Sequence, residues 1–316
     1  MSEILKLNFM DRPDEERWLD AETRLKILGA LDNRGVTDDG LRMERLPVSP
    51  MIGRMLLASI AYGCTREMCT IAAALTARPV FVRPRGKEDE SKLAHARFFA
   101  NVSSDAATLF NVMRAWDNQQ DKPRRECFAW ARDNFLSSRA LTEIEQNRQQ
   151  MMAILEKEGV EIVSLGNAEQ VLKAIAAGLI VNLAIAHSDD RSFRSNDHDN
   201  IYIHPGSSTW GSRMPMFVYT TIVETSRAFA RNISLLRPEW LSELLPKAAL
   251  QEKWNISYGE VSVRLYYRNL EISRRIVTDL AEMPAYIRSE LEARQNRTLP
   301  EQSAFGSIWA IRRKRR

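Results

Sequence analysis

The spacing of apolar residues changes past Gly159, and this change limits the possible folds more than any other feature of the chain. Before Gly159, apolar residues recur every three to four positions, as on the buried face of an amphipathic helix. After one more helix, 167–180, the period falls to two in segments 201–204 and 216–224, and 228–236 is a further extended run. Helices followed by short strands predict an α+β fold that is mostly α-helical.

Capping residues and helix breakers divide the helical part of the chain. Thr37 and Thr65 are good N-cap residues, and Ser49 followed by Pro50 is typical of a helix start. Gly159 is a typical helix end. The predicted helices cover 14–30, the segments that follow Thr37, Ser49 and Thr65, then 91–100, 105–119, 124–158 with a break at Ser137-Ser138, and 167–180.

Gly35 and Gly40 stand at the spacing of a phosphate-binding loop. Such a loop needs Lys and then Ser or Thr after the second glycine, and a buried strand before the first. Leu41 and Arg42 follow Gly40, and a polar turn precedes Gly35. We therefore interpret the two glycines as a turn and a packing contact and do not expect a nucleotide site there.

The second part of the chain predicts a small barrel or an open sheet, because its short strands are separated by Gly, Ser, Asn and Asp residues. Pro238 begins another helix. The last segment, 251–316, is less regular, and we expect a strand at 261–267 and a helix at 279–295 within it.

The basic character of the chain is concentrated at its end. Residues 312–316 carry five positive charges, and the formal net charge of the whole chain is +4, so the remainder carries −1. The sequence pI near 9.0 is therefore due to the basic tail. A nucleic-acid-binding surface in the rest of the chain would have to come from local clusters of cations.

Composition indicates a globular protein. No apolar run approaches the ~20 residues of a membrane span, and residues 1–10 contain one lysine without an apolar signal segment, so we expect a cytoplasmic protein that does not bind membranes. Cys64, Cys69 and Cys127 lack the spacing of a zinc site and are expected to be reduced, buried thiols.

A polar loop holds the densest group of metal-ligand residue types. Metal ligands usually lie on rigid elements with supporting hydrogen bonds, and most of this group lies between strands, so we expect no metal. No serine or cysteine lies in a recognisable nucleophile motif, and we expect no catalytic residue. The group comprises His187, Asp189, Asp190, Asp197, His198, Asp199 and His204.

Two sets of polar residues have two interpretations each. Arg139, Glu143 and Gln146 share one helical face, which is either solvated or lines a nucleic-acid channel. Arginines in the strand-rich part alternate with aromatic residues, which suits a surface that holds phosphates and stacks bases, although such aromatics are as often the core of a small barrel. The set contains Arg194, Arg213, Arg227 and Arg231 with Tyr202, Trp210 and Phe229.

Several dispersed motifs, in the right order, resemble the C-terminal region of DEAH-box RNA helicases. The resemblance covers about residues 5–247 and stops where 251–316 begins. Ala106-Ala107 and Gly206 depart from the family's usual pattern. The motifs are NFMDRPDEERW and VTDDGLRMERLPVSPMIGRMLLASIAYGC for a winged helix; TLFNVMRAW and DNFLSSRAL for a ratchet domain; and VLKAIAAGLIVNLA, YIHPGSS, FVYTTIVETSRAFARNI and RPEWLSELLP for an oligonucleotide-binding (OB) fold.

The resemblance implies a degenerate winged helix at 1–62, a helical ratchet bundle at 63–165, a small OB-like β-barrel at 166–250 and an extension with a basic tail at 251–316. It also implies contacts to single-stranded RNA or DNA, mainly through phosphates and stacked bases. The candidate residues are Arg139, Arg194, His204, Ser207, Ser208, Thr225, Arg227, Arg231, Arg312, Arg313, Lys314, Arg315 and Arg316.

The two RecA-like lobes that hold ATP in this family have no counterpart in the sequence, which contains no phosphate-binding loop, D-E-A-H sequence or arginine-finger motif. We therefore expect no cofactor on this chain, with ATP and Mg²⁺ bound only through a motor domain that is missing or separate. The favoured function is an RNA-binding accessory module that lines a helicase channel. A protein-interaction scaffold that docks a motor or activator, and a fragment of a split helicase gene, are the alternatives.

Overall fold

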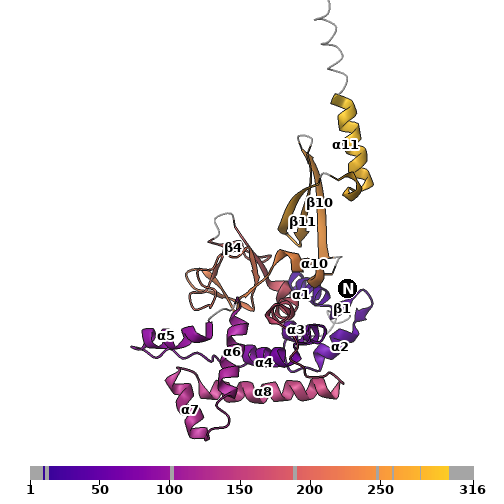
Figure 1. Cartoon of the computed structure of the whole chain (residues 1–316). Helices are drawn as coiled ribbons and strands as arrows, with labels where there is room; N and C mark the ends of the chain where they lie inside the picture. The colour runs from indigo at the N-terminus through magenta and orange to yellow at the C-terminus, as the bar shows by residue number, and fades with distance from the viewer. Residues whose placement is uncertain are drawn as a thin grey trace, which may run out of the picture. The chain divides into compact units, whose positions relative to one another are not determined.

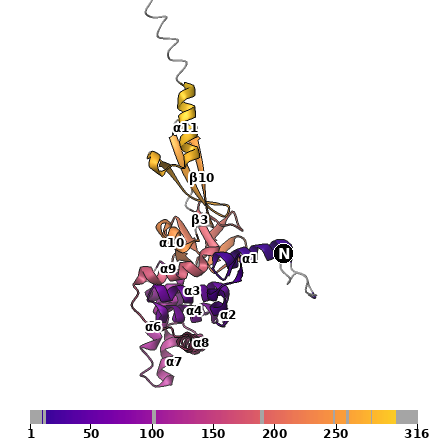
Figure 2. The same ribbon diagram turned by 90° about the vertical axis from the view of Figure 1, so that its right-hand side faces the viewer.

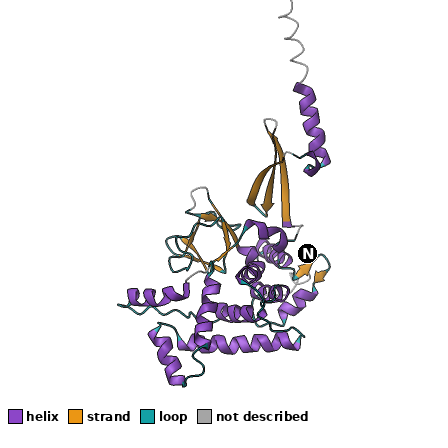
Figure 3. Ribbon diagram, in the orientation of Figure 1, coloured by secondary structure: helices purple, strands orange, loops and turns teal. Residues whose placement is uncertain are grey.

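The computed structural model describes Met10 and residues 14–99, 103–187, 191–246, 249–257, 260–277 and 279–298. The chain divides into two compact units, Met1–Lys247 and Ala248–Arg316. The first unit contains helices followed by a curled sheet, which confirms the predicted α+β class (Figure 1, Figure 3). None of the described helices is both long and apolar enough to cross a lipid bilayer.

The first unit begins with a helix, a two-stranded hairpin and two further helices. Thr37 accepts a hydrogen bond from the backbone N–H of Gly40, so the predicted cap is confirmed. These elements are α1 (Glu15–Ile27), β1 (Leu31–Asp32), β2 (Gly35–Val36), α2 (Asp38–Glu44) and α3 (Pro50–Ala61).

The two glycines of the hairpin region have the predicted roles. Gly35 has a φ of +131°, which a residue with a side chain rarely adopts, and it is the first residue of β2, directly after the turn at residues 33–34. A Cβ atom on Gly40 would lie 2.2 Å from the carbonyl oxygen of Ala30, so a side chain there would separate α2 from the segment that precedes the hairpin.

Six helices follow, and their starts agree closely with the sequence signals. Ser104, Ser137 and Asn167 each cap the helix that follows, and the break near Ser137 is confirmed. The prediction that Thr65 is a cap was wrong, because Cys64 occupies that position and the Thr65 hydroxyl accepts a hydrogen bond from the N–H of Val163. The helices are α4 (Thr65–Thr76), α5 (Glu88–Phe99), α6 (Asp105–Asp117), α7 (Arg124–Asp133), α8 (Ser138–Lys157) and α9 (Ala168–Leu179).

Helix α3 packs on both α4 and α9 (Figure 1, Figure 2). A Cβ atom on Gly178 would lie 2.2 Å from the carbonyl oxygen of Met51, so this glycine allows α9 to approach α3 closely. Cys64, Cys69 and Cys127 are buried and free, as predicted, and burial raises the pKa of the Cys64 thiol to about 12.

A seven-stranded sheet completes the first unit, in the order β7-β8-β5-β4-β3-β6-β9, and curls around one apolar core (Figure 3). The predicted strand 216–224 is two strands that separate at Tyr219-Thr220, and 228–236 likewise divides before Ser234. The strands are β3 (Leu183–Ala186), β4 (Phe193–Arg194), β5 (Ile201–Ile203), β6 (Met216–Val218), β7 (Thr221–Glu224), β8 (Ala228–Arg231) and β9 (Ser234–Leu235), with short helices Ile180–Asn182, Pro238–Trp240 and α10 (Leu241–Leu244) beside them.

The second unit is a three-stranded antiparallel sheet with a helix packed on it. The sequence predicted the middle strand and the helix but missed the strands on either side. Val261, Val263 and Val277 form its core with Met283 and Ile287. Its elements are β10 (Leu250–Ser257), β11 (Glu260–Tyr267), β12 (Leu270–Val277), a short helix Leu280–Glu282 and α11 (Ala285–Thr298).

Candidate nucleic-acid interface

A groove of about 490 Å³ lies between the helical region and the curled sheet of the first unit. Its helical side comes from the end of α4, the segment 77–83 and the facing ends of α5 and α6. Its sheet side comes from the segment after β5 and from β7 and β8. Four basic side chains line it, Arg78, Arg83, His204 and Arg231, and we call it the basic groove.

The segment that carries Arg78 and Arg83 is held by backbone hydrogen bonds to the turn between α7 and α8. The N–H of Val82 donates to the carbonyl of Phe135, and the N–H of Ser137 donates to the carbonyl of Val80. These bonds fix the backbone, while both arginine side chains remain exposed. The guanidinium of Arg83 is therefore presented to solvent from a defined backbone, whereas that of Arg78 forms an ion pair with Glu143 at 2.5 Å.

His204 lies between two hydrogen-bond donors. Its Nδ1 is 3.0 Å from the backbone nitrogen of Gly206, and its Nε2 is 3.1 Å from a guanidinium nitrogen of Arg231. Arginine only donates, so the His204 ring is the acceptor in the contact with Arg231. The other N–H groups of the Arg231 guanidinium can donate to an acceptor in the groove, such as a phosphate oxygen.

Arg83 adds a second guanidinium to this pair. A Cβ atom on Gly206 would lie 3.1 Å from Nη2 of Arg83, so the guanidinium packs directly over the glycine. Burial lowers the pKa of His204, and the charges of Arg231 and Arg83 lower it further, whereas Asp105 opposes them. The neutral form of the ring is therefore favoured at pH 7, and the unpaired positive charge among the described groove residues comes from Arg83 and Arg231, with the Asp105 carboxylate beside them.

Asp105, the first residue of α6, holds the other side of the groove together. Its carboxylate accepts hydrogen bonds from the hydroxyls of Ser207 and Ser208 at 2.8–2.9 Å and from the N–H of Ser208 at 2.7 Å. It also accepts from the N–H of Ile233 at 3.0 Å. The candidate residues Ser207 and Ser208 are therefore bound to α6, and their hydroxyls position the turn that follows His204.

An aromatic and basic strip runs along the sheet towards the groove. The guanidinium of Arg227 lies over the Tyr202 ring at 4.7 Å, Tyr202 pairs with Phe229, and Phe229 contacts His204 edge to face. These rings are partly exposed, whereas the barrel core contains Phe193, Phe217 and Tyr219 instead. Tyr202 and Phe229 are therefore surface residues. We call Arg227, Tyr202 and Phe229 the sheet strip.

The remaining candidate residues that the structure describes do not line the groove. Thr225 is in the exposed turn between β7 and β8, and Arg194 is half-buried on β4, next to the core residue Phe193. Arg139 lines a second hollow, and residues 312–316 lie outside the described residues. The second hollow is lined by Arg78, Arg124, Phe128, Ser138, Arg139, Thr142, Glu143 and Gln146, which confirms that Arg139, Glu143 and Gln146 share one face.

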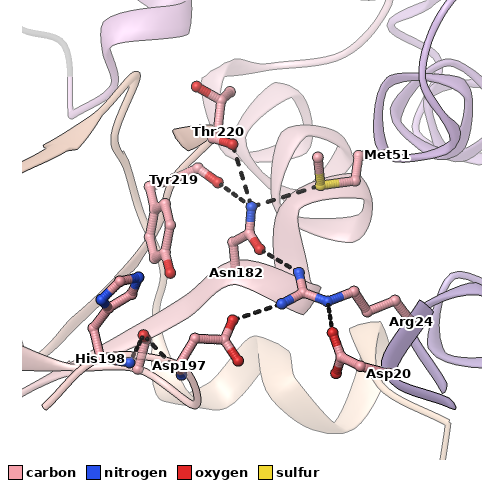
Figure 4. A network of polar contacts seen from close by, with 9 residues as sticks. Asp20, Arg24, Met51, Asn182, Asp197, His198, Tyr219 and Thr220 are labelled. Carbon is pink, nitrogen blue, oxygen red and sulfur yellow. Dashed lines mark hydrogen bonds and ion pairs between the residues drawn. The ribbon is translucent and has the colours of Figure 1, made fainter. Parts of the chain in front are cut away.

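The polar loop weighed as a metal site takes part in a different network (Figure 4). Arg24 of α1 forms ion pairs with Asp20 and Asp197, both at 2.6 Å, and donates to the amide oxygen of Asn182 at 2.9 Å. Asp189 and Asp190 lie outside the described residues. Within the described ranges, no three His, Cys, Asp or Glu side chains converge as a metal site would require. The network instead joins the N-terminal helix to the sheet.

Sequence reasoning missed Arg78, Arg83 and Asp105 as parts of the interface. Arg83 lies in a charged connection that the sequence leaves without a fixed position, and it meets Gly206 only through the fold. The sequence placed Asp105 at the start of a helix, directly after the cap Ser104. It did not indicate the contacts of Asp105 with Ser207 and Ser208, because these join segments about a hundred residues apart.

Comparisons with known proteins identify both sides of the groove. Residues 49–142 match the family described as helicase associated domain (HA2), ratchet-like, and residues 171–248 match the oligonucleotide/oligosaccharide-binding (OB)-fold family. Arg78 and Arg83 lie in the first match, and His204 and Arg231 lie in the second.

Two curated relatives are RNA helicases. The chain is 29% identical over 249 residues to the pre-mRNA-splicing factor ATP-dependent RNA helicase prp22 of Schizosaccharomyces pombe, covering 78% of this chain and 21% of the helicase. It is 30% identical over 247 residues to the probable ATP-dependent RNA helicase DHX35 of Pongo abelii, covering 77% of this chain and 34% of that protein. The chain thus spans about a fifth and about a third of these relatives. Together, these matches show that the chain carries the ratchet-like helicase-associated domain and the OB-fold domain found in the C-terminal part of DEAH-box RNA helicases.

Proposed function

We propose that this chain is a nucleic-acid-binding accessory module of a DEAH-box-type ATP-dependent RNA helicase. In this proposal, the basic groove and the sheet strip hold a single strand. The observation that carries the proposal is the convergence of two guanidinium groups, Arg83 and Arg231, on the imidazole of His204 at the junction of the ratchet-like and OB-fold regions.

The chemistry of the groove suits a phosphodiester backbone. Guanidinium groups donate to phosphate oxygens, and a groove with this charge attracts a polyanion before contact. The apolar part of the lining includes Phe81, Phe99 and Leu109, which offer a surface for sugars or bases. Such contacts bind single strands with little preference for sequence.

The sheet strip extends this path away from the groove. Tyr202 and Phe229 are partly exposed rings beside the exposed Arg227, and stacking of a base on an aromatic ring contributes about 1–3 kcal/mol. We propose that bases stack on the strip while phosphates enter the groove near His204 and Arg231. Arg194, Thr225, Arg139 and residues 312–316 are proposed as outer contacts.

We further propose that residues 1–62 form the degenerate winged helix, 63–165 the ratchet domain, 166–250 the OB domain and 251–316 the extension. A RecA-like motor, on another polypeptide or in a further segment, is proposed to supply ATP hydrolysis. Hydrolysis needs a lysine, Mg²⁺-binding acids and arginines that converge on the phosphates. The purified chain is therefore expected to release no phosphate from ATP, with or without RNA.

A binding titration tests the proposal. Fluorescence anisotropy of a labelled uridine dodecamer is measured against the full chain, against Arg227→Glu and against the control Arg17→Glu, which reverses an exposed charge on α1. We expect Arg227→Glu to weaken binding by about 1–3 kcal/mol. Arg17→Glu should leave the affinity within about twofold of the unaltered chain.

Thermal melts of the same samples separate a lost RNA interaction from lost structure. Arg227 is exposed, so its variant should melt with the unaltered chain. Unchanged affinity in Arg227→Glu, or an equal loss in Arg17→Glu, would remove the sheet strip from the binding surface. A labelled deoxyuridine dodecamer in the same titration distinguishes RNA from DNA.

A further inference from the structure

The second unit begins where the match to the OB-fold family ends, at residue 248. One face of its sheet is covered, because Val261, Val263 and Val277 pack there with Met283 and with Ile287 of α11. Residues on a strand alternate between the two faces of the sheet, so the positions between these valines belong to the opposite face.

Three cations lie abreast on that opposite face. Lys253 of β10 pairs with Arg264 of β11, and Arg264 pairs with Arg274 of β12, so one residue from each strand contributes to a single row. Lys253 and Arg274 are exposed, and Arg264 is half-buried between them. We call these three residues the cationic row.

The row has little negative charge to balance it. Glu271 is 3.6 Å from Arg264 and accepts a hydrogen bond from the Tyr266 hydroxyl at 3.2 Å. The ammonium of Lys253 lies over the Tyr266 ring, 4.4 Å from its centroid. Among the residues that the structure describes, no carboxylate lies within 4.0 Å of Lys253 or Arg274.

This arrangement costs stability in the absence of a ligand. Like charges at directly opposed positions of neighbouring strands repel, and here two such pairs share one residue. A bound polyanion removes that repulsion. Strands are 4.7–4.9 Å apart, so the backbones that carry Lys253 and Arg274 are separated by roughly 10 Å, and their long side chains can reach different phosphates of one strand.

We propose that the cationic row is a second nucleic-acid contact, which binds the sugar–phosphate backbone of a single strand. It lies outside the two family matches and goes beyond the function proposed for the groove. Cations interleaved with an aromatic ring, Tyr266, are the composition of surfaces that bind single strands. The five basic residues 312–316 belong to the same unit of the chain and give it a net positive charge, because residues 248–311 contain eight Lys or Arg and eight Asp or Glu.

The test uses the full chain and two matched neutral substitutions. Arg274→Gln removes a cation from the row, and Arg288→Gln removes an exposed cation from α11 of the same unit. We expect Arg274→Gln to weaken binding of a labelled uridine dodecamer about three- to tenfold and to lower the slope of log K against log[salt] by roughly 0.7. Arg288→Gln should change the affinity by less than about twofold.

Thermal melts add a readout that a purely structural role would not reproduce. Because Arg274→Gln relieves repulsion, its melting temperature should equal or exceed that of the unaltered chain. If Arg274→Gln melts at a lower temperature than the unaltered chain, Lys253→Gln, at the other end of the row, replaces it in the test. The same changes in RNA affinity, salt slope and melting temperature are then expected of Lys253→Gln.

Three outcomes would overturn the proposal. They are unchanged RNA affinity in Arg274→Gln and Lys253→Gln, an equal loss in Arg288→Gln, and binding of a labelled hexaglutamate peptide as tight as that of RNA. The last result would assign the row to an acidic protein partner. Arg231→Glu, measured in the same titration, reports on the groove alone, so failure of the row and failure of the groove are distinguishable.

Discussion

Asp105→Asn is a near-isosteric substitution that tests whether one carboxylate joins the ratchet-like region to the OB-fold region. In the least disruptive orientation, the amide oxygen stays at the position that accepts from Ser208. The amide nitrogen then faces the N–H of Ile233, which loses its acceptor. An unsatisfied buried donor costs about 1–3 kcal/mol.

The other hydrogen bonds of Asp105 survive in weaker form. Bonds to a charged group contribute about 1.5–3 kcal/mol and bonds between neutral groups about 1 kcal/mol, so each of the two or three retained bonds loses roughly 0.5–2 kcal/mol. Together with the lost bond to Ile233, the substitution should lower the free energy of unfolding of the first unit by about 2 kcal/mol or more.

Urea denaturation followed by circular dichroism measures this loss. Asp121→Asn makes the same chemical change at an exposed position and should stay within about 0.5 kcal/mol of the unaltered chain. Ser208→Ala and the double variant Asp105→Asn/Ser208→Ala complete a double-mutant cycle. The losses of stability should not be additive, because the two residues share hydrogen bonds. An Asp105→Asn chain as stable as Asp121→Asn, or additive effects in the cycle, would refute the joining role.

Three further predictions concern packing, pH and salt. Gly178→Ala places a methyl group against the carbonyl oxygen of Met51 and should destabilise the first unit by about 1–3 kcal/mol in a thermal melt; an unchanged melt would contradict the close approach of α9 to α3. The pKa of His204 lies below its usual value in the free chain, and a bound polyanion favours the protonated ring, so lowering the pH from about 8 to 6 should tighten RNA binding, and His204→Gln should lose that dependence. Deletion of 312–316 should reduce the slope of log K against log[salt] for RNA binding by up to about 0.7 for each phosphate that the tail neutralises in the full chain. Loss of all RNA binding on this deletion would argue against the groove.

The helix starts were predictable because their signals are local. Ser104 and Ser137 accept from backbone N–H groups three residues ahead, a bond that depends only on nearby sequence. Strand β3 was missed because it continues an apolar run that begins in α9, and a short apolar run does not distinguish a buried helix from a buried strand. In the second unit, the register of β11 with β12 skips Ile272, between Glu271 and Ser273, and this bulge interrupts the alternation of the missed strand β12.

The groove was predictable only in part. His204 and Arg231 belong to motifs and were named from the sequence, whereas Arg83 reaches Gly206 across more than a hundred residues of chain. Sequence periodicity places a residue on a face of its own element but does not identify the element that packs opposite. The aromatic residues illustrate the same limit, since Tyr202 fitted a core or a surface equally well until the core was seen to contain Phe193 and Phe217.

Photochemical crosslinking tests the central claim most directly, because it reports where a strand lies and not only that it binds. A dodecamer that contains 4-thiouridine is bound to the full chain, irradiated and digested, and the crosslinked peptides are identified by mass spectrometry. Crosslinks are expected in the segments that carry Phe81 and Arg83, Tyr202 and His204, and Phe229 and Arg231. Crosslinks confined to residues 299–316, or to the second unit, with none in those three segments would contradict a single strand bound in the basic groove.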